Sequence, residues 1–99
     1  MLVAVTDHAA ERFRQRVRGT LEAKLEVASR VARAHAAGRV DAGDGGAVLV
    51  RDLERRGLVY VCRPEAEELV VVTLWEEGED AAVPRRFTNA LRRDDDRVK

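Results

Sequence analysis

A histidine and two arginines recur at four-residue intervals near the start of the chain, as His8, Arg12 and Arg16. Residues four apart lie on one stripe of a helix. An imidazole exchanges a proton near neutral pH, and guanidinium groups are permanent cations whose donors match phosphate oxygens. The spacing therefore predicts chemistry at a phosphodiester. It is equally typical of a solvated helix edge, with the arginines paired to nearby carboxylates and the histidine bonded to a neighbouring group.

Cleavage of RNA without a metal is the reaction that this set of side chains favours. It needs a base for the 2′-hydroxyl proton, an acid for the leaving oxygen and fixed positive charge around the phosphate. His8 suits the proton transfer, and Arg12 and Arg16 suit the charge. Two aromatic residues add candidate RNA contacts: Tyr60 for orienting a phosphate or a base, and Trp75 for stacking an unpaired base. Both are also typical of core packing.

The net charge is zero, with 18 basic and 18 acidic residues, so the chain lacks the strongly basic total of many RNA-binding proteins. The signs are nevertheless segregated along the sequence. Residues 1–35 hold seven basic and four acidic side chains, and residues 65–80 hold seven acids and no base. Further on come Arg85, Arg86, Arg92 and Arg93. The acidic segment indicates a surface for a basic partner or a second copy, and this arginine cluster is its candidate complement.

The elements that would position these residues follow from periodicity and punctuation. Thr6 or Asp7 is a suitable N-cap for a helix that ends near Gly19. On the next helix, Leu21, Leu25, Ala28 and Ala32 share the face that we expect to be buried. Pro84 is a favourable first residue for a C-terminal helix. The predicted segments are an apolar run 2–5, helices to residue 19 and over 21–37, strands 47–53, 58–62 and 69–75, a helix 84–93, and a charged, disordered tail 94–99.

This order predicts a single α+β domain over residues 1–93. Two N-terminal helices precede an antiparallel sheet of three to four strands, and the helices cover one face in a two-layer arrangement. An additional strand is expected at the N-terminus or near Arg39. Cys62 is the single cysteine and reads as a core residue. His35 reads as a packed or edge histidine. Two histidines without a nearby acidic ligand pattern do not make a zinc site, so we expect no metal and no cofactor. With no apolar run of spanning length, we expect a cytoplasmic protein without a membrane.

The helix motif His-Ala-x-x-Arg-x-x-x-Arg from His8 to Arg16, together with a late strand that ends in Thr73-Leu-Trp, carries a family resemblance. Over residues 6–75 the chain resembles small bacterial domains of unknown function that are related to RelE-like and BrnT-like toxins. These belong to the wider barnase, colicin and RelE group of RNA-cleaving folds. The resemblance implies a RelE-like fold and metal-independent RNA cleavage by a toxin paired with an antitoxin. His8, Arg12 and Arg16 would match the helix motif, and Thr73 would match the strand threonine.

Two functional hypotheses follow. The first is an RNA-directed, toxin-like endoribonuclease, acting on or off the ribosome and held by an antitoxin. His8, Arg12, Arg16 and Thr73 would be catalytic, and Tyr60, Trp75, Arg85 and Arg86 would contact RNA. The second is a non-catalytic interaction module of the same fold. It would form a homodimer or bind a basic partner through the acidic segment 65–80.

Overall fold

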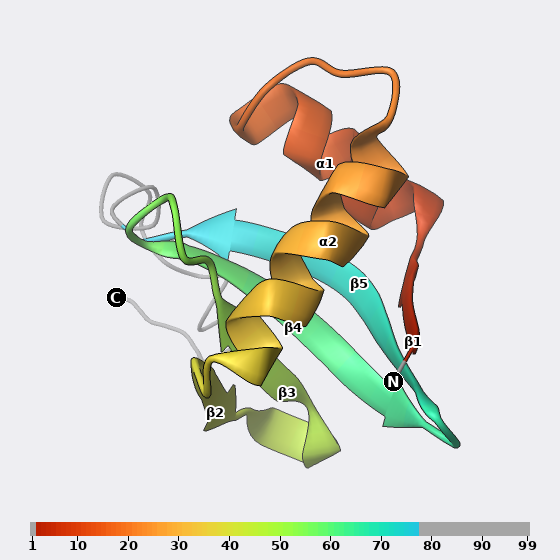
Figure 1. The fold of residues 1–99 in the computed structure, drawn as a ribbon, viewed down its shortest axis with the longest axis vertical. Coiled ribbons are helices and arrows are strands. Elements are labelled where there is room, and N and C mark those ends of the chain that lie inside the picture. The colour runs from red at the N-terminus through yellow and green to blue at the C-terminus, as the bar shows by residue number, and fades with distance from the viewer. Residues whose placement is uncertain (1, 78–99) are drawn as a thin grey trace, which may run out of the picture.

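The computed structural model of this chain describes residues 2–77. A short strand, two helices and then four strands follow one another along the chain (Figure 1). The predicted helix 84–93, the tail and residues Arg85 and Arg86 lie outside the described residues. The elements are β1 (Leu2–Val5), α1 (Asp7–Arg16), α2 (Ala23–Ala36), β2 (Val40–Ala42), a short 3-10 turn (Asp44–Gly46), β3 (Val48–Arg51), β4 (Leu58–Glu65) and β5 (Glu68–Glu76).

The strands form one five-stranded sheet in the order β1-β5-β4-β3-β2. Short connections make β2, β3, β4 and β5 antiparallel neighbours, as the sequence predicts. In contrast, β1 pairs with β5 in parallel, with Leu2 opposite Glu68 and Val5 opposite Val71. The α+β class is confirmed. The expected antiparallel sheet of three to four strands is instead a mixed sheet of five, because both candidate extra strands, at the N-terminus and after Arg39, join it and the N-terminal one pairs in parallel.

Both helices pack on one face of the sheet, and α2 crosses in front of the strands in Figure 1. α1 lies against β5 and α2, whereas α2 lies against β1 and β3. Thr6 is the N-cap of α1, since its Oγ1 accepts from the Ala9 backbone N–H at 3.1 Å. Ala9, Ala10 and Phe13 then bury the sheet-facing side of that helix. The core therefore sits between the two helices and the sheet.

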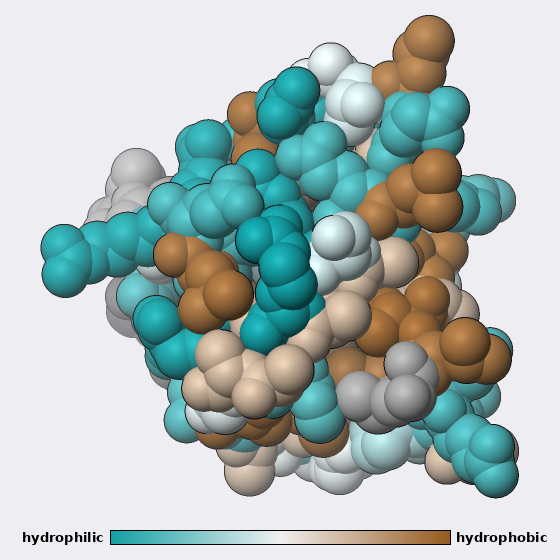
Figure 2. Space-filling model, viewed as in Figure 1, coloured by the Kyte–Doolittle hydropathy of each residue, from teal (hydrophilic) through white to brown (hydrophobic). Residues whose placement is uncertain are grey.

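The buried face of α2 differs from the predicted one. Leu21 precedes the helix and is 94% exposed, and Leu25 is 68% exposed. Hydrophobic side chains accordingly protrude near the start of α2 in Figure 2. The face that packs on the sheet consists instead of Ala23, Val27, Arg30, Val31 and Ala34. Periodicity favours the leucine face because it treats Arg30 as solvated. In the fold, the Arg30 guanidinium pairs with the buried Asp52 carboxylate, so Arg30 lies on the packed face of α2 together with Val27 and Val31.

A β-bulge interrupts the pairing of β4 with β5. Val61 lies opposite Thr73 and Cys62 lies opposite Val71, so Val72 is an extra residue on β5. Side chains alternate along a strand, and an inserted residue reverses that alternation. Val71 and Leu74 both belong to the core cluster despite their odd spacing. Thr73 is therefore directed to the sheet face opposite the one that α1 and α2 cover.

Candidate functional site

Three residues of the predicted motif lie along α1. His8 and Arg16 are exposed and Arg12 is half-buried. None of the hydrogen bonds and ion pairs seen among residues 2–77 involves the His8 side chain. Arg12 is anchored, because its Nε donates to the Leu74 carbonyl at 2.8 Å. α1 thus presents an accessible imidazole one helical turn from a guanidinium group held against the sheet.

Arg12 also has a structural role at the edge of β5. β1 pairs with β5 only as far as Val71, so within residues 2–77 no strand lies beside the later carbonyl groups of β5 on this edge. Thr6, the N-cap of α1, supplies donors to this edge instead. Its backbone N–H donates to Val71 O at 3.1 Å, and its Oγ1 donates to Val72 O at 3.2 Å. The Arg12 bond to Leu74 continues this series. The polar groups of an open sheet edge are satisfied in this way.

Thr73 and Trp75 lie on the other side of the sheet from α1. Both follow the reversed alternation after the bulge, with Thr73 opposite Val61 and Trp75 opposite Val59, and both are half-buried. The structure does not bring either side chain to the His8 stripe. The predicted catalytic set is therefore divided, with three members on α1 and Thr73 on the opposite face of the sheet.

Tyr60 is on the helix side but is fully buried. Its hydroxyl donates to Asp52 Oδ1 at 2.7 Å. Burial raises the pKa of Tyr60 far above its ordinary value, and the hydrogen bond to Asp52 adds to this effect. Because no part of the ring is accessible, the prediction that Tyr60 contacts RNA does not fit this structure. The tyrosine instead belongs to a buried polar network.

That network centres on Arg30 and Asp52, neither of which is recognisable as a site residue from the sequence pattern alone. The Arg30 guanidinium contacts Asp52 Oδ2 and Glu26, each at 3.2 Å, and Glu54 at 3.4 Å. It also lies 5.3 Å from the centroid of the Phe13 ring. Two features of the sequence are consistent with this position. Arg30 has helical spacing with the buried valines of α2, and it follows Glu26 by four residues, the spacing of an ion pair along a helix.

Asp52 also organises the turn between β3 and β4. Its Oδ2 accepts from the Glu54 N–H at 2.9 Å and from the Arg55 N–H at 2.7 Å. The Arg55 side chain pairs with Glu76 and donates to the Arg16 carbonyl at 3.3 Å. The end of α1 is therefore tied through this turn to the buried network, which holds the motif in place.

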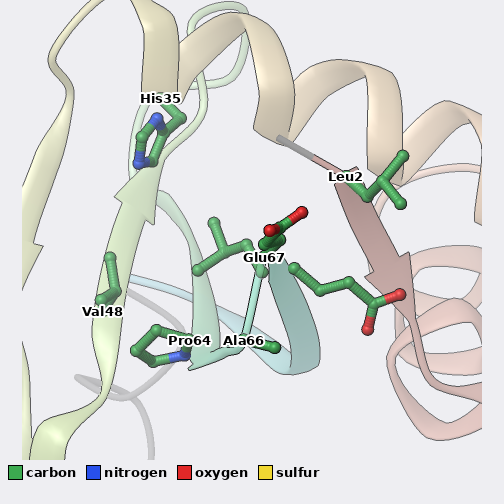
Figure 3. Close-up of a pocket in the computed structure, with 8 residues that line it drawn as sticks. Leu2, His35, Val48, Pro64, Ala66 and Glu67 are labelled. Carbon is green, nitrogen blue, oxygen red and sulfur yellow. The ribbon is translucent and has the colours of Figure 1, made fainter.

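Two of the cavities have linings made up of described residues only, and neither of these two includes a residue of α1. One, of about 390 Å³, adjoins the β3–β4 turn and is lined by Arg39, Arg51, Asp52, Leu53, Glu54, Arg56, Gly57 and Glu77. The other, of about 530 Å³, lies at the β4–β5 hairpin and is lined by Leu2, His35, Val48, Pro64, Ala66, Glu67, Glu68 and Leu69 (Figure 3). The second has a more apolar lining and combines it with two carboxylates.

Within residues 2–77 no group of three or more histidine, cysteine, aspartate or glutamate side chains is placed to hold a metal ion. In the same part of the chain, neither helix is long and apolar enough to span a bilayer. Comparison with family models, with curated proteins and with solved structures yields no match for this chain.

Proposed function

We propose that this chain is an RNA-directed, toxin-like domain that cleaves a phosphodiester through α1 without a metal. The observation that carries the proposal is the accessible His8 imidazole, in line with the anchored Arg12. An anchored guanidinium loses little further freedom on meeting a phosphate, so its charge is preorganised. Arg16, one turn further along, adds a second cation. An antitoxin would hold such a domain inactive.

In the proposed reaction, His8 accepts the 2′-hydroxyl proton as the 2′-oxygen attacks phosphorus. The bond to the 5′-oxygen breaks, that oxygen takes a proton from water, and a 2′,3′-cyclic phosphate remains. Arg12 and Arg16 stabilise the negative charge that builds on the phosphoryl oxygens. Thr73 has no part in this reaction, because the bulge directs it to the opposite sheet face.

Expression in a sensitive bacterial host tests the proposal. We expect the native chain to arrest growth and His8→Ala to be harmless. General base catalysis contributes about 10²–10⁴-fold to rate. Arg14→Gln is the matched control, since Arg14 lies on the same helix and pairs with Glu11 at 3.0 Å. Equal growth with the native chain, His8→Ala and Arg14→Gln, at equal protein levels, contradicts the nuclease.

A non-catalytic interaction module is the second candidate, and the acidic β4–β5 hairpin favours it. Glu65, Glu67 and Glu68 are exposed, and none of the ion pairs seen among residues 2–77 includes them. Unpaired carboxylates clustered beside a cavity make a suitable surface for a basic polypeptide. With this function, the chain is expected to associate with itself or with a basic partner and to leave RNA intact.

A further inference from the structure

The cavity beside the β3–β4 turn has a lining that is rich in charged side chains. Its wall contains three arginines and three carboxylates, and Leu53, which is 42% exposed, adds an apolar side chain. The cavity volume of about 390 Å³ lies in the range of sites for small ligands. The charged groups that have no partner in the protein decide which ligand this cavity suits.

The three carboxylates of this lining are already paired with arginines. Asp52 and Glu54 each contact the Arg30 guanidinium, at 3.2 Å and 3.4 Å. Glu77 contacts Arg51 at 3.0 Å. Each carboxylate of the cavity therefore has a guanidinium partner within the described part of the chain.

Arg39 and Arg56, the other two arginines of the lining, lack such a partner. Both are exposed, and none of the ion pairs and side-chain hydrogen bonds found among residues 2–77 involves either guanidinium. Arg39 also lies directly opposite Arg51, since the Arg51 backbone N–H donates to Arg39 O at 2.9 Å and continues the β2–β3 ladder by one pair. Like charges at opposed positions of neighbouring strands repel each other. Two carboxylates offset the charge of Arg51, whereas none of the described residues offsets that of Arg39.

A phosphate group has the chemistry that these two guanidinium groups require. Guanidinium donors form a planar fork that matches phosphate oxygens, and the opposite charges of the two partners strengthen the hydrogen bonds. The cavity also adjoins the α1 motif, because Arg55, which precedes Arg56 in the turn, donates to the Arg16 carbonyl at 3.3 Å. From His8 to Arg16, α1 covers about 12 Å at roughly 1.5 Å per residue. A single RNA strand that lies along α1 would therefore reach the turn within a few nucleotides.

We infer that the cavity beside the β3–β4 turn is a phosphate-binding site in which Arg39 and Arg56 hold the anion. The phosphate belongs either to an RNA strand or to free inorganic phosphate, which present the same kind of oxygen to the two guanidinium groups. The inference goes beyond the proposed cleavage, because the lining of this cavity contains no residue of α1. It holds whether or not His8 acts as a base.

Fluorescence anisotropy with a labelled single-stranded oligoribonucleotide tests the inference on the full chain. Its 2′-hydroxyl groups are methylated, so the probe cannot undergo the proposed cleavage and reports binding alone. Arg39→Gln and Arg56→Gln are each expected to weaken binding at least threefold, and the two together at least tenfold, because charge-assisted contacts are lost. Arg63→Gln is the matched control, since Arg63 is also exposed and without an ion pair among residues 2–77, but lies at the other end of β4. Circular dichroism verifies that every variant is folded.

Calorimetric titration with inorganic phosphate distinguishes the two sources of the anion. Binding of inorganic phosphate alone, weakened in Arg39→Gln and Arg56→Gln, assigns the site to free phosphate, and binding of the oligonucleotide with the same losses assigns it to RNA. Glu77→Gln is expected to strengthen binding severalfold, because it removes a carboxylate from the lining and frees a donor of Arg51.

Three results overturn the inference. The first is a native chain that binds neither probe. The second is binding by Arg39→Gln and Arg56→Gln that is no weaker than binding by Arg63→Gln. The third is a loss of binding in Glu77→Gln, which would show that the cavity does not select an anion.

Discussion

Replacing Asp52 with Asn tests whether the buried network holds the two layers together. The Asp52 side chain is 1% exposed and pairs with Arg30 at 3.2 Å. It accepts three further hydrogen bonds: from the Tyr60 hydroxyl at 2.7 Å and from the backbone N–H groups of Glu54 and Arg55. Asparagine has nearly the same shape, but it lacks the charge and replaces one acceptor with a donor. The substitution therefore removes electrostatics and hydrogen bonds without opening a cavity.

The expected loss follows from the burial of Arg30. Removing one partner of a buried ion pair costs about 3–5 kcal/mol, because the other charge stays buried without compensation. Here Arg30 keeps Glu26 and Glu54, which are more exposed than Asp52. We therefore expect the low end of that range, about 3 kcal/mol. A domain of this size is stable by only about 5–15 kcal/mol, so Asp52→Asn is expected to be folded but fragile.

Urea unfolding followed by circular dichroism measures this loss directly. Asp41→Asn is the control, because Asp41 also pairs with an arginine, Arg51, but on the surface, where such a pair is worth about 0–1 kcal/mol. If Asp52→Asn costs no more than Asp41→Asn, the network does not stabilise the fold and the argument from burial is refuted.

Other expected outcomes concern the strand edge, alkaline pH and the hairpin turn. Arg12→Met keeps the apolar stem and loses the Nε bond to Leu74, so the free energy of unfolding falls by about 1 kcal/mol in urea; an unchanged midpoint contradicts the anchoring role. Burial raises the pKa of the Cys62 thiol to about 12, so the folded state favours its neutral form. The contribution of the neutral thiol to the free energy of unfolding is therefore fully present below about pH 9 and is lost as pH rises toward 12. We expect stability to fall more steeply over this range in the native chain than in Cys62→Ala; parallel pH profiles of the two contradict this. Ala66→Gly relieves the left-handed backbone and raises the urea midpoint by the equivalent of about 0.5–1 kcal/mol, whereas a lowered midpoint shows that the turn is not strained.

Local signals predicted much of the fold. The cap at Thr6 and the apolar stripe of Ala9 and Phe13 define α1, and the short connections after β3 and β4 define antiparallel neighbours. Pairing of β1 with β5 was beyond such reasoning, since Leu2 and Glu68 meet across most of the described chain. No local pattern encodes a contact at that separation, so the parallel edge strand appears only in the structure.

The candidate site was predictable to a similar extent. Helical spacing is sufficient to place His8, Arg12 and Arg16 on one helix. Thr73 was grouped with them by the family resemblance alone, and the run of consecutive apolar residues in β5 gives no sign of the bulge that directs it to the other sheet face. Periodicity places Arg30 away from the face of Leu21 and Leu25 because it treats a charged residue as exposed, whereas Asp52 compensates that charge in the interior.

Cleavage of a radiolabelled RNA by the purified chain in the presence of EDTA is the direct test of His8 as the base of a metal-independent ribonuclease. We expect products that end in a 2′,3′-cyclic phosphate from the native chain and from Arg14→Gln, with the rate reduced at least a hundredfold in folded His8→Ala. Intact RNA with the native chain, or equal cleavage by His8→Ala, would contradict it.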